Sequence, residues 1–226
     1  MRKRLTWVVA GALVVSLVPS TAFAAVVAQW KMDEGSGASV MTDSAGGDNN
    51  GAISSVITGV PGLAGGNAYQ FDGATSYVNV PDAPELDPGT KDIALQATVK
   101  VEDGEILDDS YDIVRKGITS TPGGDFKMEI KRNGTDTTVG KLLCVFKGTN
   151  TVKRQARPDI VDGRAHTLKC IKKAGSVQAV VDGRSYTTTA TAGAIANDQP
   201  VVLGSKVAGD DVLQGVLDEV SINIGG

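Results

Sequence analysis

The 226-residue chain has few of the residues on which many enzymes and membrane proteins depend, with one histidine, two cysteines and 4% aromatic residues. Any His-dependent mechanism must therefore use His166, and a metal site built from two cysteines and one histidine has little support. After residue 24 no long apolar run follows, so no further membrane segment is expected. The net charge is −4 and the basic residues are scattered, which argues against nucleic acid or an anionic membrane as a partner.

The N-terminus has the pattern of a secretory signal peptide. Three basic residues precede an apolar run at 5–18, and the small residues Ala22 and Ala24 follow it. The alternative is an uncleaved membrane anchor, but the run is shorter than the roughly 20 apolar residues of a span. We therefore predict a signal peptide at 1–24 and a secreted, extracellular mature chain at 25–226 that leaves the membrane after cleavage.

Apolar and polar residues alternate through most of the mature chain, most clearly at 93–101, 126–130 and 177–181. This period is typical of strands that bury one face. Asp-Gly and Asn-Gly pairs separate the stretches at short intervals, and no long amphipathic helix is evident. The pattern predicts a single all-β domain, an antiparallel β-sandwich of the jelly-roll kind.

Two short segments carry specific expectations within this sandwich. In "AYQFDGATSYVNV", residues 68–80, Asp72 is interpreted as a hairpin-turn residue rather than a chemical group, because Gly73 tolerates positive φ. Cys144 and Cys170 each share parity with apolar strand neighbours. In a secreted chain this pattern favours a disulfide between neighbouring strands, which would stabilise the folded state by about 3 kcal/mol. The alternative is two unpaired thiols in the core.

Several segments, in their order along the chain, together resemble the LamG-like, concanavalin A-like jelly-roll family of secreted lectin and glucanase-type domains. The segments are "AQWKMDEGSGASVMTDSAGGDNNGAI", "AYQFDGATSYVNVP", "DIALQATVKV", "YDIVRKG", "DGRAHTLKCIKKAGSVQAVVDGR" and "LQGVLDEVSI". The resemblance implies the concanavalin A-like fold, which hosts sugar binders, protein binders, hydrolases and lyases. Ala165, and Gln96 with Ala97, stand where the family often has tryptophan, which weakens the case for a strong glycan site.

Catalytic chemistry has little support in the sequence. Glucanase relatives place carboxylates as Glu-x-Asp-x-x-Glu, and the acidic stretch 102–112 lacks this spacing. We interpret its members as a solvated acidic loop: Glu102, Asp103, Glu105, Asp108, Asp109 and Asp112. His166 shares parity with Leu168 and is interpreted as a structural, hydrogen-bonded residue. No G-x-S-x-G or P-loop spacing is present.

A structural calcium ion is a further hypothesis. Alternation in the last strand puts Asp218 on the apolar face, where a carboxylate must be paired or bind a metal. The polar stretch 33–51 offers the oxygen ligands that calcium prefers. The resemblance implies Asp33 and Asp218 as ligands, and more weakly Asp43 and Asn49. The alternative is that Asp218 accepts hydrogen bonds from backbone N–H groups of the N-terminal loop.

Three functions remain open on these observations. The first is a secreted, non-catalytic domain that binds an extracellular carbohydrate or protein, with structural calcium. The second is a small polysaccharide-active hydrolase or lyase, which requires two carboxylates facing each other on the concave sheet. The third is a cell-surface structural or interaction protein without a small ligand. The sequence does not indicate the oligomeric state.

Overall fold

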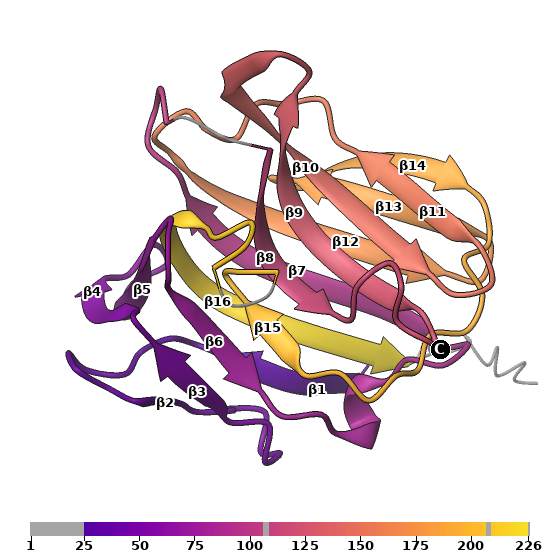
Figure 1. Ribbon diagram of the computed structural model, residues 1–226, viewed down its shortest axis with the longest axis horizontal. Helices are drawn as coiled ribbons and strands as arrows, with labels where there is room; N and C mark the ends of the chain where they lie inside the picture. The colour runs from indigo at the N-terminus through magenta and orange to yellow at the C-terminus, as the bar shows by residue number, and fades with distance from the viewer. Residues whose placement is uncertain (1–24, 106–108, 207–208, 226) are drawn as a thin grey trace, which may run out of the picture.

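The computed structural model describes residues 25–105, 109–206 and 209–225. Two antiparallel sheets of eight strands each pack face to face, as the jelly-roll prediction requires (Figure 1). The predicted signal peptide at 1–24 lies outside the described residues. In the described part of the chain, no helix has the length and apolar character needed to cross a membrane.

The first sheet is centred on two long strands, β7 (Asp92–Lys100) and β16 (Gln214–Gly225), which pair along most of their length. β7 corresponds to the alternating stretch predicted at 93–101, and every second residue of it is buried. Around this pair lie β1 (Ala25–Trp30), β4 (Ile57–Pro61), β5 (Asn67–Asp72), β12 (Ala165–Lys173), β13 (Ser176–Val181) and β14 (Arg184–Thr189).

The second sheet runs in the order β11-β10-β9-β8-β15-β6-β3-β2. Its strands are β2 (Val40–Met41), β3 (Gly51–Ser54), β6 (Tyr77–Val80), β8 (Ser110–Lys116), β9 (Asp125–Asn133), β10 (Asp136–Lys147), β11 (Thr151–Gln155) and β15 (Val201–Leu203). A single turn of 3-10 helix, η1 (Pro84–Leu86), follows β6. The 33–51 stretch is irregular except for β2 and the start of β3.

The core between the sheets takes up most of the chain's few aromatic side chains. Its largest members are fully buried: Trp30, Tyr69, Phe71, Phe126 and Phe146. Burying one such side chain contributes roughly 1.5–3 kcal/mol to folding. Among the described residues, Tyr77 is the one aromatic residue that is not buried. Tyr77 is therefore the most exposed aromatic ring in the described part of the chain.

The predicted disulfide between Cys144 and Cys170 is present, with a Cα–Cα distance of 5.3 Å. The expectation that it joins neighbouring strands is wrong, because Cys144 lies on β10 of the second sheet and Cys170 on β12 of the first. Both side chains point into the core, as their parity predicted, and both are fully buried. The bond therefore links the two layers of the sandwich.

Asp72 is a turn residue, as predicted, but the turn does not close a hairpin, because β5 belongs to the first sheet and β6 to the second. Its carboxylate accepts hydrogen bonds from the backbone N–H groups of Ala74, Thr75 and Ser76 at 2.8–2.9 Å, and Gly73 adopts a φ of 73°. Burial opposes ionisation of the carboxyl group, but the N–H groups of Thr75 and Ala74 outweigh it and hold the pKa of Asp72 well below its usual range. The carboxylate thus closes the β5–β6 connection.

A bulge in β16 overturns the expectation that Asp218 shares a face with the apolar residues after it. Glu219 has a φ of 50°, and the pairing with β7 shifts between Asp218 and Ser221. Leu217 and Val220 therefore both belong to the core although they are three residues apart. Because side chains alternate along a strand, Asp218 points to the opposite side of the sheet from Leu217.

Candidate functional site

Asp43 and Asn49 come together within the 33–51 stretch. Asp43 Oδ1 accepts hydrogen bonds from the backbone N–H groups of Gln29 (3.0 Å) and Ala45 (2.9 Å), and Asn49 Nδ2 donates to Asp43 Oδ2 at 3.1 Å. Asn50 Oδ1 in turn accepts from the N–H of Asp43 at 2.8 Å. We call Asp43, Asn49 and Asn50 the loop cluster. Its carboxylate meets N–H donors, which hold the irregular chain against β1.

Asp33 and Asp218 contact residues 62–67, which form the β4–β5 turn and the first residue of β5. Asp33 Oδ1 accepts from the N–H of Asn67 at 2.9 Å, and Asp218 Oδ2 accepts from the N–H groups of Leu63 (2.8 Å) and Ala64 (3.1 Å). Asp218 is 1% exposed, and its Oδ1 is buried without a hydrogen-bond partner. Among the described residues, no three His, Cys, Asp or Glu side chains gather closely enough to hold a metal ion.

His166 lies at the start of β12 between two carboxylates. Its Nε2 is 2.9 Å from Asp162 Oδ1 and its Nδ1 is 2.8 Å from Asp182 Oδ2. Burial alone would lower the pKa of His166, but the hydrogen bonds to Asp182 and Asp162 raise it above its ordinary value. The two carboxylates occupy both ring nitrogens, which fits the structural role that the sequence predicted.

The acidic stretch 102–112 is solvent-exposed only in part. Glu102, Asp103 and Asp109 are exposed as predicted, while Asp108 lies outside the described residues. The expectation for Asp112 is wrong, because its side chain is fully buried. Residues 110–116 form β8, which places Asp112 opposite Glu129 of β9 and close to basic side chains.

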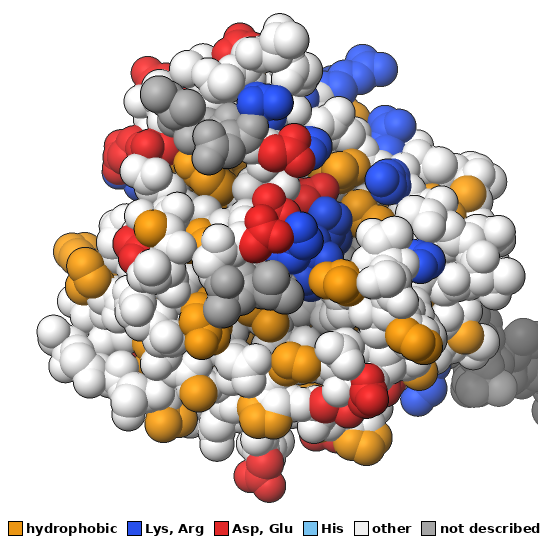
Figure 2. Space-filling model, in the orientation of Figure 1, with side chains coloured by type: hydrophobic (Ala, Val, Ile, Leu, Met, Phe, Trp, Pro, Cys, Tyr) orange, Lys and Arg blue, Asp and Glu red, His pale blue; other side chains and the backbone are white. Residues whose placement is uncertain are grey.

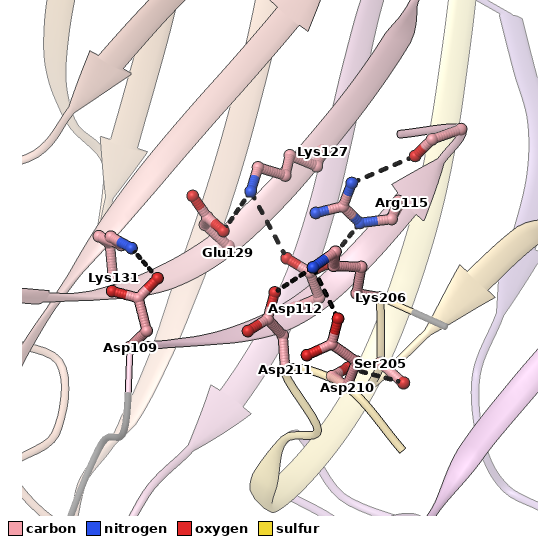
Figure 3. Close-up of polar contacts among 11 residues, drawn as sticks. Asp109, Asp112, Arg115, Lys127, Glu129, Lys131, Ser205, Lys206, Asp210 and Asp211 are labelled. Atoms are coloured by element: carbon pink, nitrogen blue, oxygen red, sulfur yellow. Dashed lines mark hydrogen bonds and ion pairs between the residues drawn. The ribbon is translucent and has the colours of Figure 1, made fainter. Parts of the chain in front are cut away.

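A group of charged side chains crosses the outer face of the second sheet (Figure 3). On β9, Phe126, Met128 and Ile130 point into the core, so Lys127 and Glu129 point outward. We call this group the charged cluster, which comprises Asp109, Asp112, Arg115, Lys127, Glu129, Lys131, Lys206, Asp210 and Asp211.

Ion pairs connect the members of the charged cluster. Arg115 Nε donates to Asp112 Oδ2, and Lys127 Nζ donates to Glu129 Oε2 and lies 4.0 Å from Asp112 Oδ1. Figure 3 shows Arg115 and Lys127 reaching Asp112 from two sides. At the two ends, Lys131 pairs with Asp109, and Lys206 pairs with Asp210 at 2.6 Å. The Arg115–Asp112 and Lys127–Glu129 pairs are largely buried. The Lys131–Asp109 and Lys206–Asp210 pairs are partly exposed.

Burial dominates the electrostatics at the centre of this cluster. It raises the pKa of Asp112 to about 6, although the Arg115 guanidinium lowers it in opposition. Burial likewise raises the pKa of Asp125, the next outward carboxylate along β9. Asp112 Oδ1 and Asp125 Oδ2 are both buried without a hydrogen-bond partner. The centre thus retains acceptor oxygens that the described part of the chain does not satisfy.

Beside the charged cluster, the same face is hollowed over β3, β6 and β15. The hollow has a volume of about 440 Å³ and is lined by Ala52, Ser54, Tyr77, Asn79, Pro200 and Val202, among others. Figure 2 shows acidic and basic side chains side by side at the middle of the face, with apolar side chains below them. The face combines an aromatic and apolar surface with hydroxyl, amide and charged groups.

Local sequence patterns do not show that Tyr77, Arg115, Lys127 and Glu129 lie on one face. One available signal was the outward parity of Lys127 and Glu129 between apolar residues. The meeting of β6, β8, β9 and β15 on one face depends on pairings between distant segments.

The comparison with protein families identifies one match. The model of the "Concanavalin A-like lectin/glucanases superfamily" matches residues 72–223. No curated protein sequence is recognisably similar to the chain.

Solved structures similar to the chain include binding domains and parts of enzymes. The binding domain of Paraclostridial Mosquitocidal Protein 1 has a TM-score of 0.68 at 13% identity; the match covers 90% of this chain and 49% of that one. Domain 4 of the Geobacillus stearothermophilus extracellular arabinanase AbnA, in complex with arabinotriose, has a TM-score of 0.64 at 17% identity, covering 90% and 94%. Trypanosoma rangeli sialidase in complex with sialic acid has a TM-score of 0.59 at 13% identity, covering 88% and 30%.

The chain thus spans about half the length of the mosquitocidal binding domain and nearly all of the arabinanase domain. At these identities the similarity shows the shared fold.

Proposed function

Because the chain belongs to the concanavalin A-like lectin/glucanases superfamily, we propose that it is a secreted, non-catalytic domain that binds an extracellular saccharide. The proposal places the ligand in the hollow over β3, β6 and β15. The observation that carries it is Tyr77, the one described aromatic residue outside the core, which lines this hollow.

The chemistry of the hollow suits a sugar ring. A volume of about 440 Å³ lies within the roughly 300–1,000 Å³ typical of small-molecule sites. The ring of Tyr77 and the side chain of Val202 can contact the C–H face of a sugar, and Asn79 and Ser54 can hydrogen-bond its hydroxyl groups. Similar structures that bear bound saccharides or are named binding domains support this proposal.

Glycan-array binding of the mature protein tests the proposal, followed by calorimetric titration of the best ligand. Tyr77→Ala should weaken binding roughly tenfold or more, because it removes the stacking surface. Asn79→Ala tests the hydrogen-bonding side, with Asn223→Ala on the first sheet as its matched control. If no glycan on the array binds and the mature protein binds an extracellular protein instead, the ligand is a protein and not a saccharide.

The enzymatic alternative rests on the placement of Asp112 opposite Glu129 on this face. A glycoside hydrolase needs two carboxyl groups about 5–9.5 Å apart that flank the scissile bond. Here both side chains are buried, with 0% and 2% exposure, and both are engaged by Arg115 or Lys127, so neither is presented to a substrate. We therefore favour binding. Release of reducing ends from a polysaccharide, abolished by Glu129→Gln, would establish a hydrolase instead.

A structural calcium ion is part of the proposal and concerns Asp33 and Asp218. The buried, unpartnered Oδ1 of Asp218 supports it, as does the shared contact of both residues with residues 62–67. Asp43 and Asn49 are hydrogen-bonded to each other, so calcium binding by these two residues would require their side chains to rearrange. We expect calcium to raise the melting temperature and a chelator to lower it, with Asp218→Asn removing the difference. Equal melting with calcium and with chelator would refute this part.

Secretion is also proposed. The disulfide that links the two sheets supports it, because such bonds persist in oxidising compartments. N-terminal sequencing of protein exported by a secreting host should begin at Ala25. Retention of residues 1–24 on membrane-bound protein would indicate the anchor instead.

A further inference from the structure

A second, smaller cavity adjoins the hollow. Its volume is about 100 Å³, and it shares Pro200 and Val202 with the hollow. Arg115 and Lys206 of the charged cluster and the amide of Gln199 line it. The two cavities therefore form one continuous surface that leads from the ring of Tyr77 to two basic side chains.

Arg115 is held in a fixed position at this cavity. It is 4% exposed, and it donates from Nε to Asp112 Oδ2 and from Nη1 to the carbonyl oxygen of Gly117 at 3.2 Å. The guanidinium carries further N–H groups on Nη2. Arg115 lines the cavity, and the planar donor edge of a guanidinium matches the geometry of a carboxylate.

Lys206 adds a second, more adaptable positive charge. Its Nζ lies 2.6 Å from Asp210 Oδ2 and 3.6 Å from Asp211 Oδ2, and about a third of its side chain is exposed. Partly exposed ion pairs of this kind contribute at most about 1 kcal/mol, so a ligand can compete for the ammonium group.

The charges around the cavity restrict the type of anion. The charged cluster contains more acidic than basic side chains, including Asp112, Asp210 and Asp211 near Lys206 and Arg115. A densely sulfated or phosphorylated ligand would meet repulsion from these carboxylates. A single carboxylate carries less negative charge and therefore meets less of this repulsion, next to Arg115 and Lys206 in a cavity of about 100 Å³.

We propose that the saccharide bound on this face is acidic, with a sugar ring against Tyr77 in the hollow and its carboxylate in the cavity lined by Arg115 and Lys206. This inference rests on the proposed saccharide-binding function and specifies its ligand class. The carboxylate receives charge-assisted hydrogen bonds from both basic side chains.

The first test compares matched ligands on the mature protein. An array of uronic acid- and sialic acid-containing oligosaccharides carries each glycan beside its carboxyl-reduced counterpart. At least one acidic glycan should bind about tenfold or more tightly than its reduced form, because charge-assisted hydrogen bonds are lost on reduction. Equal binding of acidic and reduced forms would refute the inference and leave the saccharide function intact. No binding to any saccharide would refute both.

The second test uses variants with the best acidic glycan. Lys206→Gln should weaken its binding roughly tenfold, whereas Lys173→Gln, the same charge change at an exposed position on β12, should leave the dissociation constant unchanged. The double variant Arg115→Gln/Asp112→Asn removes the guanidinium without stranding its buried partner. Its folding is checked by thermal melting, and if it does not fold, Lys206→Gln decides. Equal effects of Lys206→Gln and Lys173→Gln would overturn the proposal.

Discussion

The loop cluster and the charged cluster both bury carboxylates near the surface of the sandwich, but they satisfy them with different partners. In the loop cluster, Asp43 accepts only N–H donors from the backbone and from Asn49. In the charged cluster, Asp112 and Glu129 face the cations Arg115 and Lys127.

This difference matches the two roles that we propose, a structural one for the loop cluster and ligand recognition for part of the charged cluster. N–H donors hold a carboxylate at a fixed position relative to the backbone, so the loop cluster holds the irregular 33–51 stretch in place next to β1. Cationic side chains form strong hydrogen bonds with anions, and this is the role that we propose for Arg115 and Lys206 toward a ligand carboxylate. Unpartnered oxygens also remain at the centre of the charged cluster, on Asp112 and Asp125.

The largest effect is expected when a cation is removed from the charged cluster. Arg115→Met leaves the buried Asp112 carboxylate without its guanidinium and should lower the free energy of unfolding by about 3–5 kcal/mol. Urea denaturation measures this loss of free energy of unfolding. Lys131→Met, which breaks the partly exposed pair with Asp109, is the matched control and should cost less than about 1 kcal/mol. Similar losses for the two variants would contradict the difference between centre and edge.

The disulfide lies outside both clusters and links the two sheets. Replacing Cys144 and Cys170 by alanine should lower the free energy of unfolding by about 3 kcal/mol, as expected for a loop of this length. Unfolding should remain a single transition when followed by fluorescence and by circular dichroism. Separate transitions would show that the two sheets are coupled mainly through this bond.

The loop cluster should be less costly to disrupt than the charged cluster. Asp43→Ala leaves the N–H groups of Gln29 and Ala45 without their acceptor and should cost about 1–3 kcal/mol. Asp48→Ala, at an exposed position in the same stretch, is the control and should be nearly neutral. A loss for Asp43→Ala as large as that for Arg115→Met would remove the distinction between the clusters.

The smallest effect is a dependence of stability on pH that belongs to the charged cluster. Burial raises the folded-state pKa of Asp112 to about 6, above the ordinary 3.8. Between these values the unfolded chain loses this proton before the folded chain does, so the free energy of unfolding should fall as pH rises. Urea titrations across this range should show the fall, and Asp112→Asn should abolish it. An unchanged slope in Asp112→Asn would assign the effect to other groups.

At higher pH, His166 should add a separate decline in the free energy of unfolding. Because hydrogen bonds to Asp182 and Asp162 raise its folded-state pKa above 6.5, its contribution is complete at lower pH and is lost as pH rises through the folded value. This decline should persist in Asp112→Asn.

Local sequence patterns correctly predicted the parts of the fold that depend on near neighbours. The turn at Asp72 follows from Asp-Gly chemistry within a few residues, and β7 follows from strict alternation. The same alternation failed at Asp218, because the bulge at Glu219 resets the parity of β16. A bulge is a local backbone choice that the apolar pattern does not reveal.

The sequence alone determined the strand-rich architecture, the inward parity of Cys144 and Cys170, and the low aromatic content. Only the tertiary structure decided that the two cysteines join opposite sheets, that Asp112 is buried beneath Arg115, and that Tyr77 faces the same surface. The physical reason is range: turns and alternation act over a few residues, whereas burial and ion pairing depend on the register of strands far apart in the chain.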